Sequence, residues 1–270
     1  MSSIATNSNA SKAVMAVTGA SQSMLESVQK LSTGRRINSA ADDQAGLRIS
    51  SKLSTSIVSL ERAIKNANDG MSMLQTADQG AGRITDALVR MRELAIQSAN
   101  DTYSESDRDS LNQEFSELQD QANAHIQSAQ WNGQALFNGS LDTVNLQIGA
   151  TAADSFAVDM ADFSSLSSLT SSTIANRSDA LSALDAIDAD MAAVDAVRVQ
   201  WGAAVNRLEH AGEVSDAASL NMSASRSRIV DTDYAQTTAD LAKAQILQFA
   251  GQAMLSQANQ QPLSVLRLLR

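Results

Sequence analysis

The stretch SKAVMAVTGASQSMLESVQKLSTGRR, residues 11–36, decides what the rest of the chain can build. Its apolar residues recur at helical spacing: Val14, Val17, Met24, Val28 and Leu31. This spacing places them on one face of a helix, which we expect to run from Ser11 to about Arg36. Because this end of the chain cannot bury that face alone, the helix needs a partner helix.

The other end of the chain carries a second helical stripe, formed by Ala242, Ile246, Phe249, Ala250, Ala253 and Met254. Pro262, the single proline, is expected to close this helix, because proline breaks helix interiors. Two interpretations of the stripe stay open: a core helix inside a bundle, or an interface helix that becomes buried only on assembly. Terminal placement and the scarcity of aromatic residues favour the interface. The candidate interface residues are Val14, Val17, Met24, Val28, Leu31, Ile246, Phe249, Ala253, Met254, Leu266 and Leu269.

Composition limits the classes of protein that fit. Apolar residues make up 43 % of the 270 residues but aromatic residues only 3 %, so a core must be built from aliphatic side chains between slender helices. The absence of cysteine excludes disulfides and thiolate chemistry. A net charge of −10 argues against binding of nucleic acid, and no segment approaches the roughly 18 apolar residues of a membrane span. The N-terminus lacks the pattern of a secretory signal, so an exported chain would leave by another route.

Helical spacing fills most of the sequence between the two ends. A near-continuous heptad pattern begins at Leu53, shifts by a repeated three-residue step after Met71, and continues to Ala95. Asp42 and Asp43 precede it and are expected in the first turn of its helix. Two further helices are predicted: one begins at a Ser104 cap and ends near Trp131-Asn132-Gly133, and the other covers residues 178–226.

In the middle of the chain the spacing of apolar residues changes from helical to alternating. Val144, Leu146 and Ile148 alternate with polar residues, and a second alternating run follows at residues 156–160, so we predict a β-hairpin near 143–160. The Ser-rich segment 164–172 is expected to be a loop that tolerates insertions. The predicted fold class is therefore mainly α: a long antiparallel helical bundle or coiled coil with one small β-hairpin.

Several segments, in order along the chain, resemble signatures of the bacterial flagellins. LSTGRRINSAADDQAG, residues 31–46, and LVRMRELAIQSAN, residues 88–100, resemble those of the N-terminal part. SRIVDTDY, residues 227–234, with AQIL and the ending from Gln257 to Arg270, resembles the C-terminal part. The chain looks like a minimal member of the family, without the large variable domain that many members insert near the middle. Arg267 stands where the family often has a small or polar residue.

The resemblance implies a secreted, extracellular subunit that assembles itself into the bacterial flagellar filament for motility. It implies a terminal coiled-coil domain, residues 1–44 and 230–270, which would line an inner tube of the filament, and a helical rod domain, residues 45–229. The implied partners are further copies of the chain, hook-associated junction and cap proteins, and a flagellar export chaperone with the export apparatus. Neither a nucleic acid nor a membrane is an expected partner.

The resemblance also singles out one polar helix face. Arg90, Leu94, Gln97 and Glu114 match positions that the family uses to contact neighbouring subunits and the host innate receptor for flagellin. The simpler interpretation of charges on a helix is a solvated face, and it stays open here.

No arrangement of residues indicates catalysis, a metal or a cofactor. His125 falls on an apolar stripe and is expected to be a packed residue, and no cysteine or histidine accompanies His210 at metal-ligand spacing. Three alternatives to a filament subunit remain: a hook–filament junction protein, a helical-bundle enzyme and a cytoplasmic coiled-coil scaffold. The RELAIQSAN segment and the LRLLR ending favour flagellin over the junction protein.

Overall fold

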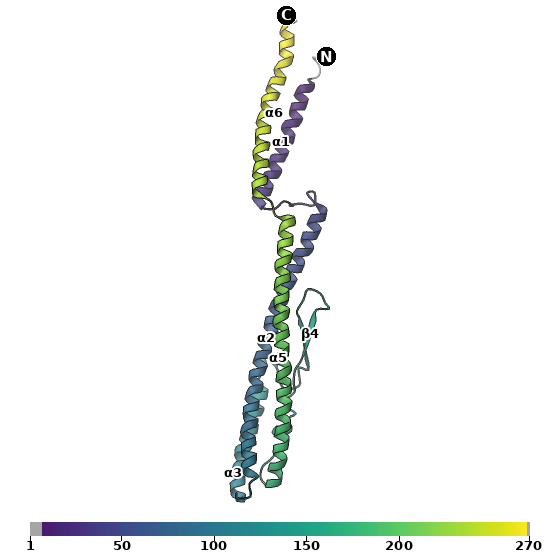
Figure 1. The fold of residues 1–270 in the computed structure, drawn as a ribbon. Coiled ribbons are helices and arrows are strands. Elements are labelled where there is room, and N and C mark those ends of the chain that lie inside the picture. Colours follow the sequence, from purple (N-terminus) through teal and green to yellow (C-terminus); the bar gives the residue numbers. More distant parts are fainter. Residues whose placement is uncertain (1–6, 269–270) are drawn as a thin grey trace. The chain divides into compact units, whose positions relative to one another are not determined.

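A computed structural model describes residues 7–268 of the chain, with side chains for residues 7–260 (Figure 1). The helices are α1 (Ser8–Thr33), α2 (Gln44–Ser98), α3 (Glu105–Ser128), α4 (Ser167–Thr170), α5 (Arg177–Val230) and α6 (Tyr234–Leu268). The strands are β1 (Gln130–Trp131), β2 (Gln134–Ala135), β3 (Thr143–Gln147) and β4 (Ser155–Asp159). The mainly α prediction is confirmed. The chain divides into two compact units, here unit 1 (Met1–Thr55 with Asn221–Arg270) and unit 2 (Ser56–Leu220).

The first helix ends earlier than its apolar spacing predicts. α1 stops at Thr33 because Gly34 adopts the left-handed conformation, with a φ of 69°. The connector that follows pairs with the link between α5 and α6. The N–H of Thr232 donates to the carbonyl oxygen of Gly34 at 3.0 Å, and the N–H of Arg36 donates to that of Val230 at 2.6 Å. Two segments far apart in the sequence are thus joined within unit 1.

Asp42 and Asp43 lie before α2, not in its first turn as predicted. The Asp42 carboxylate accepts hydrogen bonds from the N–H groups of Asn38 (2.9 Å) and Ser39 (2.8 Å), and these bonds lower the pKa of Asp42. The stabilisation they give is present at neutral pH and is lost as the pH falls through that lowered pKa. Asp43 caps the helix by accepting a hydrogen bond from the N–H of Gly46 at 2.9 Å.

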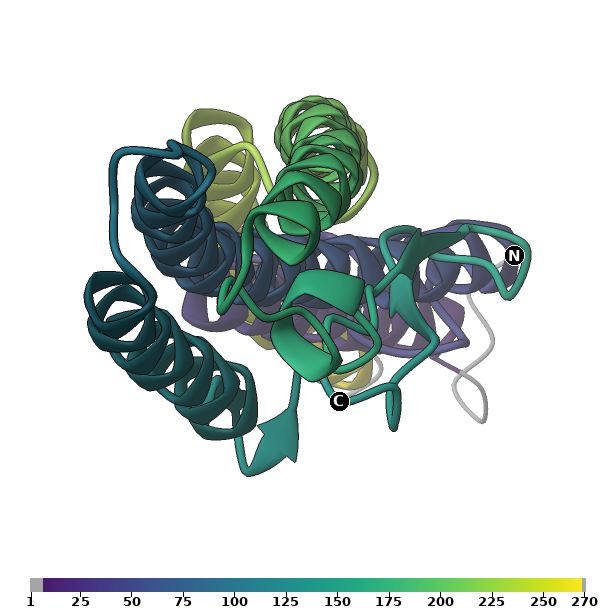
Figure 2. The same cartoon turned by 90° about the horizontal axis from the view of Figure 1, so that it is seen from below.

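Unit 2 buries the predicted heptad pattern of α2 between two other helices. Buried residues include Leu74, Ile84, Leu88 and Met91 of α2, Phe115 and Ile126 of α3, and Ile187, Val194 and Leu208 of α5. Figure 2 views these three helices nearly end-on. Ion pairs join α2 to both neighbours, since Arg90 pairs with Glu114 of α3 and Arg92 pairs with Asp188 of α5. The N-terminus of α3 carries the predicted cap, a complete capping box of Ser104 with Asp107.

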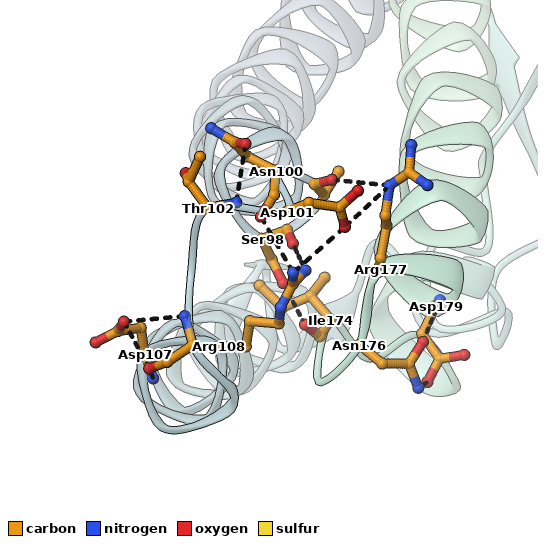
Figure 3. Close-up of polar contacts among 12 residues, drawn as sticks. Ser98, Asn100, Asp101, Thr102, Asp107, Arg108, Ile174, Asn176, Arg177 and Asp179 are labelled. Atoms are coloured by element: carbon orange, nitrogen blue, oxygen red, sulfur yellow. Dashed lines mark hydrogen bonds and ion pairs between the residues drawn. The ribbon is translucent and has the colours of Figure 1, made fainter.

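Two arginines close the C-terminal end of α2 (Figure 3). The last carbonyl groups of a helix have no partner inside the helix. The guanidinium of Arg108, on α3, donates to the carbonyl oxygen of Ser98. Nε of Arg177, on α5, donates to the carbonyl oxygen of Ala99 at 3.2 Å. Both cations also lie within 3.7 Å of the Asp101 carboxylate, so three helices are tied together at this end of unit 2.

The predicted β-hairpin is present as β3 and β4. The strands are antiparallel, with Val144 opposite Val158. The indole N–H of Trp201, on α5, donates to the carbonyl oxygen of Asp159 at 3.1 Å, and its ring stacks at 6.0 Å on Phe137. The hairpin is therefore attached to α5 through the hydrogen bond from Trp201 to Asp159.

A second pair of strands, β1 and β2, was not expected. α3 ends at Ser128, just before the residues predicted to end it, and β1 and β2 are joined by a two-residue turn at Asn132 and Gly133. Both turn residues have positive φ, 49° and 80°, which is the conformation of a type I′ hairpin turn. The Asn-Gly pair was thus a hairpin signal rather than only the end of a helix.

The Ser-rich segment 164–172 is not the loop that its composition predicts. It contains α4, which lacks a side-chain cap of its own, and the carboxylate of Asp190 on α5 accepts a hydrogen bond from the buried N–H of Ser168 at 2.7 Å. Gln119 on α3 donates to the carbonyl oxygen of Ser168, also at 2.7 Å. Backbone held by two neighbouring helices does not accept insertions. The exposed hairpin tip, residues 150–153, is the better position.

α6 continues past Pro262 to Leu268, although the proline was expected to close it. Proline lacks an N–H, so the carbonyl oxygen of Ala258, four residues earlier, loses its helical partner. Nδ2 of Asn7 donates to that oxygen at 2.8 Å. Oδ1 of the same amide accepts a hydrogen bond from the N–H of Ala10 at 3.0 Å and caps α1. One side chain therefore serves both helices.

Variants at Asn7 separate these two hydrogen bonds. Asn7→Ser keeps an oxygen for the cap of α1 but loses the Nδ2 donor to Ala258, because the serine side chain is shorter. We therefore expect unit 1 to lose about 1 kcal/mol of stability in Asn7→Ser and about 2 kcal/mol in Asn7→Ala. Hydrogen exchange of the α6 amides in purified chain measures both. Wild-type protection in the Asn7→Ser chain would show that the bond to Ala258 contributes nothing.

Insertions test the anchored segment. A short Gly-Ser peptide inserted between Ala152 and Ala153 should move the thermal midpoint of unit 2 by no more than about 2 °C, because exposed loops lengthen at little cost. The same peptide inserted after Ser168 should lower the midpoint strongly. The near-ultraviolet circular dichroism of the two tryptophans follows the transition. Equal midpoints would contradict the anchoring by Asp190 and Gln119.

Candidate interaction surface

α1 and α6 lie side by side in unit 1 and meet along a seam of small residues (Figure 1). Its buried positions recur every seven residues, at Ala20 and Ser27 of α1 and at Thr237, Ala244, Gly251 and Ala258 of α6. This is the heptad spacing of a coiled coil. The helices approach closely at Gly251, where a Cβ atom would lie 2.7 Å from Cγ2 of Val17.

Polar contacts fix the seam at both ends and in the middle. Ser21, which interrupts the apolar spacing of α1, accepts a hydrogen bond from Nε2 of Gln248 at 3.0 Å. The hydroxyl of Tyr234 donates to the carbonyl oxygen of Leu31, also at 3.0 Å. With the Asn7 contact, these bonds set which turn of α1 faces which turn of α6.

Many large apolar side chains of both helices lie outside the seam and are exposed. On α6, Ile246, Phe249 and Met254 are 67 %, 68 % and 64 % exposed. On α1, Val14 and Val28 are 48 % and 46 % exposed. Apolar faces of this kind mark sites of interaction with another molecule.

The candidate interface residues thus fall into two groups. Val17, Met24 and Leu31 are half-buried in the seam. The exposed group is Val14, Val28, Ile246, Phe249, Ala253 and Met254. Leu269 lies outside the described residues, and Leu266 lies in α6 where side chains are not described. Helical spacing located the outward face of α6, whereas the seam of α6 alternates small buried residues with the half-buried Leu241, Gln248 and Leu255 and gave a weaker signal.

Sequence reasoning missed three further exposed residues. Met15 and Leu25 of α1 and Leu247 of α6 are 73 %, 60 % and 52 % exposed. Each follows a residue of a predicted stripe by one position. These adjacent pairs could have identified the three residues from the sequence, because two neighbouring apolar residues make the apolar face of a helix wider than a single seam.

Two open grooves run beside the seam. The first, of about 430 Å³, is lined by Lys12 and Ala13 of α1 and by Met254 and Gln257 of α6, among others. The second, of about 490 Å³, is lined by small residues of α1, such as Ala16 and Ser23, and by Leu247 of α6. Apolar floors with charged edges suit the side chains of another helix.

A second candidate surface lies on α2 and α3. Arg90 forms ion pairs at 2.8 Å with Glu93 and with Glu114, and the hydrogen bond to Glu114 is the main cause that raises the pKa of Arg90. Nε2 of Gln97 donates to the hydroxyl of Tyr103 at 3.0 Å. Leu94 was expected on the same face but is only 2 % exposed and belongs to the core of unit 2. The α2–α3 face therefore consists of Arg90, Gln97 and Glu114.

Other chemistry is not indicated by the described side chains. Across residues 7–260, no three histidine or acidic residues are grouped so that they could hold a metal ion. His125 is half-buried on α3, and Nδ1 of His210 lies 3.8 Å from Glu213 on α5. No helix in the described part of the chain is long and apolar enough to cross a membrane.

Comparisons with known proteins match both ends of the chain. The family model of the bacterial flagellin N-terminal helical region matches residues 4–142, and that of the C-terminal helical region matches residues 184–269. The chain is 43 % identical over 248 residues to the flagellin of Halalkalibacterium halodurans, an alignment that covers 91 % of each chain.

Two solved structures extend the comparison. The crystal structure of Bacillus cereus flagellin matches with a TM-score of 0.52 and 28 % identity, over 56 % of this chain and 88 % of that one. A structure described as a flagellar hook-associated protein of Vibrio parahaemolyticus has a TM-score of 0.59 but only 15 % identity, over 70 % of this chain and 100 % of that one. At that identity the second match shows a shared fold alone.

Two glycines test the close approach of α1 and α6. In Gly251→Ala, the new methyl group meets Val17, so we expect a net loss of about 1 kcal/mol in the protection of α6 amides from hydrogen exchange. Gly202→Ala on α5 is the control, since no atom lies within 4 Å of its Cβ position, and it should gain about 0.5–1 kcal/mol in unit 2. A gain in protection from hydrogen exchange for both variants would mean that the seam is loosely packed.

Proposed function

The chain belongs to the bacterial flagellin family, and from this premise we propose that the outward apolar faces of α1 and α6 carry the contacts between subunits. It is a structural subunit of the bacterial flagellar filament. The observation that supports the proposal is the placement of the side chains: the fully buried positions of the seam hold small residues, and Ile246, Phe249 and Met254 are exposed and available to a neighbour.

Flagellins are structural proteins that are exported and build the extracellular filament. A filament subunit fits this chain better than a hook-associated protein, because 43 % identity over 91 % of the chain joins it to a flagellin and 15 % identity joins it to a hook-associated protein. We propose a purely mechanical role, without catalysis or cofactor, in keeping with a family of structural proteins.

The placement of the exposed residues supports contacts with more than one neighbour. Ile246 and Ala253 are seven positions apart and lie on the side of α6 opposite its seam positions, 244 and 251. Met15 lies nearly opposite the seam positions 17 and 24 of α1. Faces on two different helices make head-to-tail contacts that do not close, and such contacts extend into a helical filament.

The same proposal assigns parts of the filament to parts of the chain. Residues 1–44 and 230–270 would form the coiled-coil domain that lines the inner tube, and residues 45–229 would form the rod domain of the outer tube. The contrast in burial supports this assignment. Unit 2 has a large apolar core of its own, although residues such as Val199 and Leu220 are exposed, whereas α1 and α6 bury mainly small residues and leave Ile246, Phe249 and Met254 exposed.

Further partners are proposed from the same exposed faces. Before assembly, Phe249 and its neighbours need protection from aggregation, which an export chaperone would give on the way to the export apparatus. Hook-associated junction and cap proteins would meet the same faces at the two ends of the filament, where no further subunit covers them.

We also propose that the α2–α3 face binds another protein. Arg90, Gln97 and Glu114 are exposed; Arg90 and Glu114 hold each other by an ion pair, and Gln97 is held by Tyr103, which lowers the cost of ordering them on binding. A neighbouring subunit and the host innate receptor for flagellin are the proposed partners. Leu94 would support the face from the core beneath it.

Substitution on the outward face should weaken assembly without weakening the subunit. Burial of a phenylalanine side chain is worth about 1.5–3 kcal/mol, so Phe249→Ser should raise the critical concentration for polymerisation by about tenfold or more. Its effect on unfolding of the free chain should be small, because Phe249 is already 68 % exposed. Gln252→Ser, at an exposed polar position of the same helix, is the matched control.

Sedimentation measures the critical concentration, and electron microscopy identifies the product. Long filaments of the purified wild-type chain are expected of a filament subunit, whereas a junction protein would form none. An unchanged critical concentration for Phe249→Ser, together with a less stable free chain, would make α6 an ordinary core helix and remove the proposed interface.

A further inference from the structure

The exposed methionines of this chain lie together in unit 1. Met15 is 73 % exposed and Met254 is 64 % exposed. Every other methionine whose side chain the structure describes is half-buried or buried. Met91, by contrast, is fully buried in unit 2. Because the chain has no cysteine, methionine sulfur is its one readily oxidised side-chain atom.

We propose that Met15 and Met254 form an oxidation site through which peroxide blocks the free subunit from assembling. The proposal rests on the proposed function, since it requires that the outward faces of α1 and α6 become buried between subunits. To the proposed function it adds a covalent modification, the reaction that forms it and the two methionines that carry it.

The chemistry is a transfer of one oxygen atom. The thioether sulfur attacks one oxygen of hydrogen peroxide, an S–O bond forms, and the O–O bond breaks. The transferred oxygen loses its proton to solvent and the leaving hydroxide takes up a proton from solvent, so the sulfur is oxidised by two electrons to the sulfoxide and the peroxide is reduced to one molecule of water. A methionine sulfoxide reductase reverses the step with electrons from a dithiol.

The surroundings of the two residues explain why oxidation would matter. Met254 lines the first groove together with the small residues Ala13 and Ala258 and the polar residues Asn9, Lys12 and Gln257. Met15 lies on the side of α1 away from the seam, where α6 does not cover it. A subunit that covers either sulfoxide must bury a polar oxygen, whereas a subunit that covers the thioether buries an apolar group.

Because of this exposure, peroxide should oxidise the free chain in preference to the filament. In the monomer both sulfur atoms are open to solvent, while Met24 is half-buried in the seam and Met91 is buried in the core. In a filament the neighbouring subunits would shield Met15 and Met254. Oxidation would therefore prevent addition of subunits and would spare those already assembled.

Peptide mass spectrometry tests the selectivity. Full-length monomer and preassembled filament are treated with the same dose of hydrogen peroxide. We expect Met15 and Met254 to gain oxygen at least about tenfold faster in the monomer than in the filament, with Met91 unmodified in both. Equal rates in monomer and filament would overturn the proposal.

Polymerisation tests the consequence. Oxidised wild-type chain should show a critical concentration at least about tenfold higher than untreated chain, and methionine sulfoxide reductase should restore it. The double variant Met15→Leu, Met254→Leu conserves volume and should assemble before and after peroxide alike. The two single variants serve where the double variant assembles poorly, and each should keep part of the sensitivity.

Two outcomes overturn the proposal: normal assembly of wild-type chain in which both sulfoxides are present, or loss of assembly in the peroxide-treated double variant to the same degree as in wild type. Failure of the proposed function is distinguishable from both. It would appear as an untreated wild-type chain that does not polymerise, before any oxidant is added.

Discussion

The fully buried positions between α1 and α6 are occupied by small side chains. Ala20, Ala244, Gly251 and Ala258 bring the two backbones close together but bury little apolar area, and burial of area is what stabilises a coiled coil. Val17, Met24 and Leu31 are only half-buried beside them, and Ile246 and Phe249 are exposed. In our proposals, assembly, protection before assembly and the chemistry of the exposed sulfurs all depend on this division between small buried residues and large outward-facing ones.

Unit 2 has a large core of its own. Buried leucines, isoleucines and aromatic rings of α2, α3 and α5 contribute to this core, although Ile96, Val199 and Leu220 are exposed. Arg108, Asp190 and Gln119 bind backbone groups inside the unit. One sequence therefore contains two kinds of helix packing: one with a large core inside the single chain, and one that we propose is completed by other chains.

The elements that could be predicted from the sequence depend on residues close together in the chain. The heptad of α2, the capping box at Ser104 and the β3–β4 hairpin are of this kind. The errors depend on partners far away: α6 passes Pro262 because Asn7 supplies a hydrogen bond from 251 residues away, and Asp190 holds a Ser-rich segment that looks like a loop. Spacing placed the proposed interface residues on two terminal helices but did not divide them between the seam and the outward faces, because spacing does not say which face of α6 meets α1.

Small residues at a seam leave its register weakly determined, since alanine and glycine fit one turn of a partner helix almost as well as the next. Three polar contacts remove that freedom: Asn7 with Ala258, Ser21 with Gln248, and Leu31 with Tyr234. Each requires one particular alignment of α1 with α6, and none adds an apolar residue to the seam. Register and affinity are thus assigned to different groups. Hydrogen bonds align the two helices within a subunit, and in our proposal Ile246 and Phe249 supply the binding energy between subunits. Larger residues at the buried positions of the seam would also align the helices, but they would hold the two backbones further apart and place more of the apolar burial inside one subunit.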